Sequence, residues 1–410
     1  MIKELNYTNR NRKLNVFFII IFIVIFVLAQ LSLALNSFSL YVLVPFVFLY
    51  SLIQNPKLIW NYKPLLYFLL LILLSAVTSI NSVHMDDSQR ELKTLLGSYA
   101  VCYIVTQFSI KNLKYIHLFY VLYIFLFFVV IYRGYIEGLT YSTTERFSTD
   151  DLNANFFGYV GFYAIVSSFF VWQFAKFFII RINRNNTTYI FLFVSSVILS
   201  IMANIFAATK AGTAISLLAT GLFITTKYLI PFSLKKVRNV FLLSIIILIA
   251  IFSLNIMLEG SILQERVKTE SIAEDSRPRL LEGAFNVGMK NLLLGVGPAN
   301  FKYYSYNGGF AHSTFLEIFA NNGIFALALF LAMLFPFFMN VWNYKPPNDE
   351  QKKFKLYLLI FFTLFIVYNF FYVFHTSPFL ISFYYLVLIH SYYSLQNSQI
   401  ARRDKKLPIR

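Results

Sequence analysis

The sequence contains little charge and almost no cysteine. Charged residues make up 13% of its 410 residues, about half of the roughly 25% found in soluble globular domains. The single cysteine, Cys102, lies inside an apolar stretch, so an intrachain disulfide is excluded. The five histidines are scattered and show no metal-binding spacing. The composition therefore argues against a soluble globular protein and against a domain held by disulfides.

Hydrophobic residues make up 58% of the chain and fall into long unbroken runs. A helix needs roughly 20 apolar residues to cross the about 30 Å of hydrocarbon in a bilayer, whereas a soluble core needs no runs of that length. We therefore predict an all-α, polytopic membrane protein with about twelve transmembrane helices, the first retained rather than cleaved as a signal peptide. The predicted spans are Leu14–Leu35, Phe38–Ile53, Leu65–Ile80, Leu95–Ile110, Ile116–Tyr132, Phe156–Ile180, Tyr189–Ala208, Ala211–Ile230, Val240–Met257, Ser313–Val341, Leu356–Phe374 and Phe379–Leu395.

The charged residues separate between the two sides of this arrangement. With the N-terminus placed in the cytoplasm, most of the 35 basic residues fall in inner segments and most of the 18 acidic residues fall in outer ones. Cytoplasmic loops of membrane proteins carry such an excess of Lys and Arg. The net charge of +17 therefore indicates topology and need not imply a nucleic-acid partner. Both termini, including the polar tail at 396–410, are expected in the cytoplasm.

Three predicted outer connections are long, and function is usually placed on such loops. The largest lies between the ninth and tenth spans, and we treat residues 258–312 as the candidate catalytic loop of a single membrane domain, 1–410. The three connections are Asn81–Thr94, Arg133–Asn155 and Leu258–His312.

The largest loop carries the pattern of a short helix followed by a glycine turn. Ser276, Arg277 and Pro278 are typical of a helix start with proline in the first turn. Apolar residues then recur at helical spacing, which predicts an amphipathic helix on the outer membrane surface. A turn at Gly295 and Gly297 ends this pattern and frees backbone N–H groups. The apolar residues are Leu280, Leu281, Ala284, Phe285 and Gly288.

A polar helix face follows the turn. Ser313, Glu317 and Asn321 are spaced four apart and share one face at the outer end of an apolar span, directly after His312. A carboxylate at that depth is costly and usually faces a cavity or a partner.

The order of these residues resembles the signature of the O-antigen ligase and O-antigen polymerase superfamily. That signature has an arginine before a Gly-x-Gly turn, then His followed by Asn, Ser or Gln, and a glycine after nine more residues. The resemblance is strongest over Arg277–Ala328. It rests on Arg277, Gly295-Val296-Gly297-Pro298-Ala299-Asn300-Phe301, His312-Ser313 and Gly323, with weaker likeness at Asp151-Leu152-Asn153-Ala154-Asn155-Phe156 and Thr209-Lys210-Ala211-Gly212.

The chain departs from the family pattern at three positions. Lys210 replaces an arginine, Leu281 stands where an aromatic residue is common, and Ala326 replaces a second glycine. The lysine matters most, because it keeps the charge but loses the bidentate fork that suits phosphate.

The resemblance implies a membrane glycosyltransferase that makes surface polysaccharide at the outer face of the bacterial cytoplasmic membrane. The donor would be a glycan on undecaprenyl diphosphate and the acceptor a glycan or lipid-linked glycan. A single displacement would invert the anomeric carbon, and neither a metal nor another cofactor is expected, because fixed cations would stabilise the leaving diphosphate. The motifs do not separate a ligase from a polymerase.

The resemblance also suggests roles for individual residues. Arg277 and Lys210 would hold the diphosphate, with Arg279 or Arg146 as further candidates. The candidate catalytic group is His312, as general base or acceptor-orienting group, tuned by Glu317.

Simpler interpretations stand beside these. Arg277 and Arg279 could instead anchor a helix to anionic lipid headgroups. Lys210 could be a lysine at the end of a span whose ammonium group reaches the membrane surface, and Glu317 could be a structural acid that is satisfied by hydrogen bonds. The outer acid pairs are more typical of solvated loops than of a metal site. An aromatic cluster in the large loop suits sugar stacking or the headgroup layer equally. The acids are Asp86-Asp87 and Asp150-Asp151, and the cluster is Tyr303, Tyr304, Tyr306 and Phe310.

Other function classes predict different patterns. A polysaccharide transporter or lipid flippase predicts paired repeats, broken helices and charges at mid-membrane. A receptor or structural membrane protein predicts no convergent cationic site. The sequence shows no paired repeats, and its charges lie at span ends.

Overall fold

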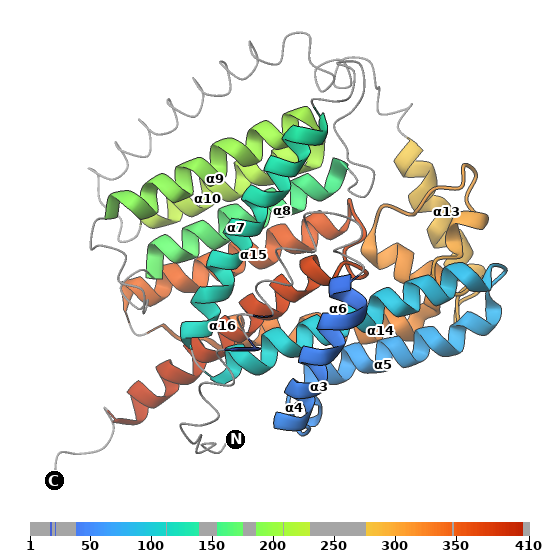
Figure 1. Ribbon diagram of the computed structural model, residues 1–410, viewed down its shortest axis with the longest axis horizontal. Helices are drawn as coiled ribbons and strands as arrows, with labels where there is room; N and C mark the ends of the chain where they lie inside the picture. The colour runs from blue at the N-terminus through green and yellow to red at the C-terminus, as the bar shows by residue number, and fades with distance from the viewer. Residues whose placement is uncertain are drawn as a thin grey trace.

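The computed structural model describes residues 17–18, 21, 38–111, 113–138, 154–174, 186–207, 209–229, 276–346 and 348–404. All regular elements in these ranges are helices, which confirms the all-α prediction for this part of the chain (Figure 1). They are η1 (Ser39–Leu43), α3 (Val44–Gln54), α4 (Leu58–Asn61), α5 (Lys63–Thr78), η2 (Ser79–Asn81), α6 (Met85–Lys111), α7 (Leu113–Gly138), α8 (Ala154–Phe174), α9 (Asn186–Phe206), α10 (Lys210–Leu229), α13 (Ser276–Lys290), η4 (Phe301–Tyr303), α14 (Thr314–Asn343), α15 (Asp349–Asn369) and α16 (Pro378–Asp404).

Within the described ranges, helices coincide with ten of the twelve predicted spans. The first span lies mostly, and the ninth wholly, outside the described residues. Five of the described helices are long and apolar enough to cross a bilayer, so the chain is a multi-pass membrane protein. The count of twelve and the orientation in the membrane stay predictions. The five segments are Lys63–Asn81, Tyr115–Gly134, Phe156–Gln173, Thr187–Ile205 and Thr314–Asn343.

Two predicted loops are shorter in the structure than the sequence suggested. The stretch Asn81–Thr94 is not a loop, because α6 begins at Met85. Its first turn carries Asp86 and Asp87, and acidic side chains stabilise the positive end of the helix dipole. The connection Arg133–Asn155 also shrinks, since α7 continues to residue 138 and α8 begins at residue 154.

The helix ends gather into two layers. At one layer, the Lys353 ammonium of α15 donates to the Lys227 carbonyl of α10 at 3.0 Å. Lys227 Nζ lies 2.8 Å from the centroid of the Trp172 ring of α8. Basic residues predicted to be cytoplasmic therefore meet at this end. The opposite layer, which we call the α13 end, contains α13, the start of α6 and the first turns of α14 (Figure 1).

Helix α14 is interrupted at Gly323, whose backbone has φ 80° and ψ −175°. The segment before the break, Thr314–Asn322, carries four polar residues, Thr314, Glu317, Asn321 and Asn322, and is mostly buried. The segment after it, Ile324–Asn343, is apolar and spans about 30 Å at 1.5 Å per residue, which matches the hydrocarbon thickness of a bilayer. The break therefore separates a membrane-crossing helix from a short helix that belongs to the α13 end.

Helix α8 forms the centre of the bundle. Of its apolar window, 89% is buried, compared with 33% to 56% in the other candidate spans. Aromatic rings fill the space around it: Tyr159 stacks on Tyr368 of α15 at 3.9 Å between ring centroids, and Tyr163 stacks on Phe383 of α16 at 4.1 Å. This packing fixes the end of α15 against the start of α8.

Candidate functional site

The Gly-x-Gly turn after α13 inserts into the break of α14. Carbonyls at the end of the first α14 segment have no partner within that helix, because Gly323 interrupts the ladder. N–H groups of the turn take their place, and the turn accepts one bond from the second segment. The bonds are Val296 N to Ala320 O at 3.0 Å, Gly297 N to Asn321 O at 2.7 Å and Ile324 N to Leu292 O at 2.8 Å.

The two glycines predicted to form this turn do so. Gly295 has φ 66° and Gly297 has φ 96°, a region that L side chains rarely adopt. A Cβ on Gly295 would collide with the Asn321 carbonyl, and one on Gly297 with Ser82 before α6. Each of these two positions therefore requires glycine for two reasons: the positive backbone angle and the close approach of a neighbouring segment.

The side chain of Asn300, at the end of the turn, forms hydrogen bonds with the start of α6, and we call this connection the clamp. The Asn300 Oδ1 accepts the His84 backbone N–H at 2.9 Å, and its Nδ2 donates to Ser88 Oγ and to the Pro298 carbonyl, both at 2.8 Å. Ser88 Oγ in turn lies 2.7 Å from the Pro298 carbonyl. The Asn300 side chain is fully buried. The sequence motif contained Asn300, but its partners lie 212 and 216 residues away, so local patterns gave no signal of this role.

We expect Asn300→Ala to lower the free energy of unfolding by about 2–3 kcal/mol, because the buried amide that joins the Ser88 hydroxyl to the Pro298 carbonyl is lost, together with its bond to the His84 N–H. Thermal unfolding in detergent, followed by fluorescence, measures this loss. Asn307→Ala is the control, since Asn307 is exposed and a surface change is expected to stay within about 0.5 kcal/mol. Equal melting temperatures for both variants would contradict the clamp.

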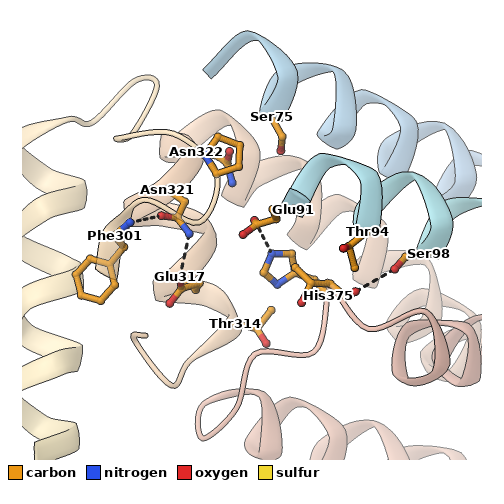
Figure 2. Close-up of polar contacts among 12 residues, drawn as sticks. Ser75, Glu91, Thr94, Ser98, Phe301, Thr314, Glu317, Asn321, Asn322 and His375 are labelled. Carbon is orange, nitrogen blue, oxygen red and sulfur yellow. Dashed lines mark hydrogen bonds and ion pairs between the residues drawn. The ribbon is translucent and has the colours of Figure 1, made fainter. Parts of the chain in front are cut away.

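Glu317 is buried and holds the segment around His312. Its carboxylate accepts the Ala311 backbone N–H at 2.7 Å and the Asn321 amide at 3.0 Å. Asn321 Oδ1 also accepts the Phe301 N–H at 2.7 Å (Figure 2). The predicted polar face of α14 is therefore real. Because its carboxylate oxygens are engaged by these donors, Glu317 positions the backbone beside His312.

His312 lies directly before α14 and is partly exposed, with φ 53°. The next residues are tied to the end of α15: Thr314 Oγ1 donates to Asn369 Oδ1 at 2.8 Å, and the Thr314 N–H donates to the Tyr372 carbonyl at 3.1 Å. The Phe374 N–H donates to Thr314 Oγ1. The end of α15 thus fixes the place of His312.

Arg277 approaches the same end of α15 from α13. It is partly exposed and interacts electrostatically with Tyr368, four residues before Tyr372. Tyr368 Oη packs against the backbone of Gly158 in α8, at the position where a Cβ would stand. A Cβ on Gly158 would also lie 3.0 Å from Gly212 Cα in α10.

Lys210 is the first residue of α10, two positions before Gly212. Thr209 precedes it and donates to Asn204 Oδ1 at 2.7 Å, which anchors the start of the helix. Contacts through Tyr368 and its neighbours therefore connect the segments that carry Lys210, Arg277 and His312.

The remaining predicted residues are placed differently. Arg279 is exposed on α13. Arg146 and the pair Asp150-Asp151 lie outside the described residues. In the described part of the chain, no three His, Cys, Asp or Glu side chains cluster as metal ligands do.

Asp87 is not the solvated loop acid that the sequence suggested. It forms an ion pair with Lys302 at 2.9 Å and accepts the Tyr303 hydroxyl. These hydrogen bonds lower the pKa of the Asp87 carboxyl group. Tyr303 also stacks on His84 at 3.8 Å between ring centroids, although it is exposed, like Tyr304, Tyr306 and Phe310. Tyr303 therefore joins the loop to α6.

Comparison with known families agrees with the motif. Residues 195–331 match the family described as O-Antigen ligase. This segment is similar to the O-antigen ligase family. The match extends from α9 into the second segment of α14, about a third of the chain, and includes Lys210, Arg277 and His312. It confirms the resemblance drawn from the residues and implies glycan processing of the O-antigen ligase type in a membrane. No curated protein matches the chain.

Proposed function

We propose that the protein transfers a glycan from undecaprenyl diphosphate to an acceptor glycan or lipid-linked glycan during surface polysaccharide assembly. The observation that carries this proposal is the family segment, which contains Lys210, Arg277 and His312. Two further contacts support it: Arg277 interacts with Tyr368 in the last turn of α15, and Thr314, two residues after His312, donates to Asn369 at the end of the same helix. The site would face the outside of the cytoplasmic membrane, with both termini in the cytoplasm.

The proposed reaction is one displacement. The acceptor hydroxyl oxygen forms a bond to the anomeric carbon, the bond from that carbon to the diphosphate oxygen breaks, and undecaprenyl diphosphate leaves. His312 takes the hydroxyl proton as general base. Attack from the face opposite the leaving group inverts the anomeric carbon.

The cationic residues act on the leaving group. Negative charge grows on the diphosphate as its bond to the sugar breaks, and fixed cations stabilise that charge most in the transition state. Arg277 at the start of α13 and Lys210 at the start of α10 supply two such charges from different helices. These charges would serve without a metal ion, and Arg279 would contact the substrate only at the rim.

We expect Arg277→Ala to lower the transfer rate by about 10²-fold, a loss comparable to removing one transition-state donor. Arg277→Lys should recover part of it, because the charge returns without the bidentate fork. The assay follows glycan transfer by the purified protein in liposomes supplied with an undecaprenyl-diphosphate-linked oligosaccharide and an acceptor. Lys290→Ala, at the exposed end of α13, is the control. Rates within twofold of wild type for Arg277→Ala would contradict the assignment.

Ligase and polymerase activities are separable genetically. Deletion of the gene should leave single repeat units attached if the protein is a polymerase. Accumulation of unattached polymer would indicate a ligase.

A transporter is the second candidate, and one observation favours it. Transport proteins often contain broken helices near their substrate site, and α14 is broken at Gly323. Here, however, the Gly-x-Gly turn fills the break with backbone hydrogen bonds. Liposomes that move the lipid-linked oligosaccharide across the bilayer without forming a new glycosidic bond would support transport over transfer.

A further inference from the structure

The layer opposite the α13 end holds two ammonium groups close together. Lys227 lies in the last turn of α10, and its Nζ is 2.8 Å from the centroid of the Trp172 ring near the end of α8. Lys353, near the start of α15, donates to the Lys227 carbonyl at 3.0 Å, and both lysines are half-buried. Helix α10 packs against both α8 and α15 (Figure 1). Three helices therefore fix two cations at one place, far in the fold from the proposed transfer site.

The surroundings of Lys227 favour an anion. In the described part of the chain, the charged side chain that acts on Lys227 is Lys353, which repels it. The tryptophan ring attracts an ammonium group but carries no net negative charge. The first turn of α15 contains Asp349 and Glu350, but both are exposed, and Asp349 pairs with Lys352 at 2.9 Å. A half-buried pair of like charges is costly unless an opposite charge joins it.

The sequence next to these helix ends adds further positive charge. The connections that follow α8 and α10, residues 175–185 and 230–239, contain six basic residues and no Asp or Glu. They therefore supply no carboxylate to Lys227, and an anion from outside the chain is the candidate counter-charge. The six residues are Lys176, Arg181, Arg184, Lys235, Lys236 and Arg238.

A neutral donor at the end of α8 also calls for an oxygen acceptor. Gln173 follows Trp172, and its Nε2 is buried without a hydrogen-bond partner among the described residues. A buried donor that stays unpaired is destabilising. Phosphate oxygens accept hydrogen bonds from both amide and ammonium groups. The end of α8 thus agrees with the two lysines in the chemistry of the ligand it would take.

An apolar surface next to the cations separates a phospholipid from a free phosphate ion. Leu218 and Leu222 of α10 are exposed and, spaced four apart, share one side of the helix within three turns of Lys227. Exposed leucines on a membrane helix contact acyl chains, and tryptophan and lysine at a span end lie at the headgroup level. A free ion would use the cations alone, whereas a phospholipid would use the cations and the leucines.

We propose that the ends of α8, α10 and α15 form a binding site for one anionic phospholipid. Its headgroup phosphate lies between Lys227 and Lys353, and an acyl chain follows the exposed leucines of α10. Basic sites between membrane helices at the cytoplasmic surface bind anionic headgroups in this way, and the predicted orientation places this site in the inner leaflet. The inference does not depend on the proposed transfer reaction.

Native mass spectrometry of the full-length protein in detergent, titrated with phosphatidylglycerol, measures the affinity of the first bound lipid. Lys227→Gln/Lys353→Gln should weaken this affinity about 25-fold, or about fivefold for each lysine. Lys345→Gln/Lys352→Gln removes the same charge from exposed positions at the same end and should change it by less than about twofold. Phosphatidylcholine, which has a phosphate but no net charge, should bind all three proteins equally weakly.

A second measurement uses the wild type alone and decides even if the double variant does not fold. Labelling by an amine-reactive reagent is followed residue by residue with peptide mass spectrometry. Phosphatidylglycerol at about four times its Kd should slow the labelling of Lys227 and Lys353 about fivefold. Lys352, whose side chain is exposed and pairs with Asp349, should be labelled at an unchanged rate.

Three outcomes would overturn the proposal. Equal losses of phosphatidylglycerol affinity in the two double variants would show a general surface effect and not a site. Unchanged labelling of Lys227 and Lys353 in the presence of the lipid would show that no headgroup lies between them. Inorganic phosphate that protected both lysines as fully as the lipid would show that the acyl chain takes no part in recognition.

Discussion

His312→Ala is expected to lower glycan transfer by about 10³-fold, within the range that a positioned general base contributes. The imidazole would accept the proton of the attacking hydroxyl, and an alanine side chain cannot take over this role. The measurement is the initial rate with purified protein and a lipid-linked oligosaccharide donor. His312→Asn should be equally slow, although asparagine tolerates a positive φ well, so backbone strain would not explain the loss.

His84→Ala is the matched control for this experiment. His84 is an exposed histidine at the same end of the bundle, and its ring stacks on Tyr303. Its loss should change the rate by less than about threefold, in line with the small effect of most surface substitutions. If both His312 variants transferred glycan at near wild-type rates, the general-base assignment would be wrong, although an orienting role for the cations would remain testable through Arg277.

Gly323→Ala is expected to be the most destabilising single substitution, by at least about 3 kcal/mol. Its backbone angles, φ 80° and ψ −175°, belong to a region used almost only by glycine. A Cβ there would also collide with the Leu293 carbonyl. The turn would then be pushed out of the α14 break, leaving carbonyls without partners. Unfolding in mixed detergent micelles measures the change in free energy.

Gly221→Ala shows whether the effect belongs to this glycine or to glycine in general. Gly221 lies in α10, and a Cβ there would meet nothing within 4 Å. Alanine is the better helix former, so this variant should be neutral or more stable by up to about 1 kcal/mol. A Gly323→Ala variant as stable as Gly221→Ala would show that the break in α14 does not require glycine.

Local patterns predicted much of the structure. The apolar runs located the described bundle helices, because helices in a bilayer must satisfy all their backbone groups internally. The start of α13 at Ser276 and the turn at Gly295 and Gly297 were also predicted, since proline at a first helical turn and glycine at positive φ act locally. These features depend on a few neighbouring residues, so one sequence was enough.

Features that depend on distant partners were missed. The start of α6 resembled a solvated loop because it is acidic. Its sequence gives no sign that the Gly-x-Gly turn packs against it. Asn300 contacts His84 across 216 positions of sequence, and nothing near either residue reveals the pair. Glu91 and His375 meet only when the connection between α15 and α16 reaches α6. Contacts between residues so far apart in sequence leave no periodic pattern that could predict them.

The clamp between α6 and the turn has a consequence for biogenesis. Residues 81–91 leave the ribosome some two hundred positions before the turn that covers them, and membrane helices are inserted in order of synthesis. Ser88 and Glu91 must therefore stay hydrated until the first α14 segment arrives. Docking of the Gly-x-Gly turn against the start of α6 is then a late folding step. Chains that stop before Asn300 should leave the polar start of α6 exposed to solvent, where quality-control proteases can reach it.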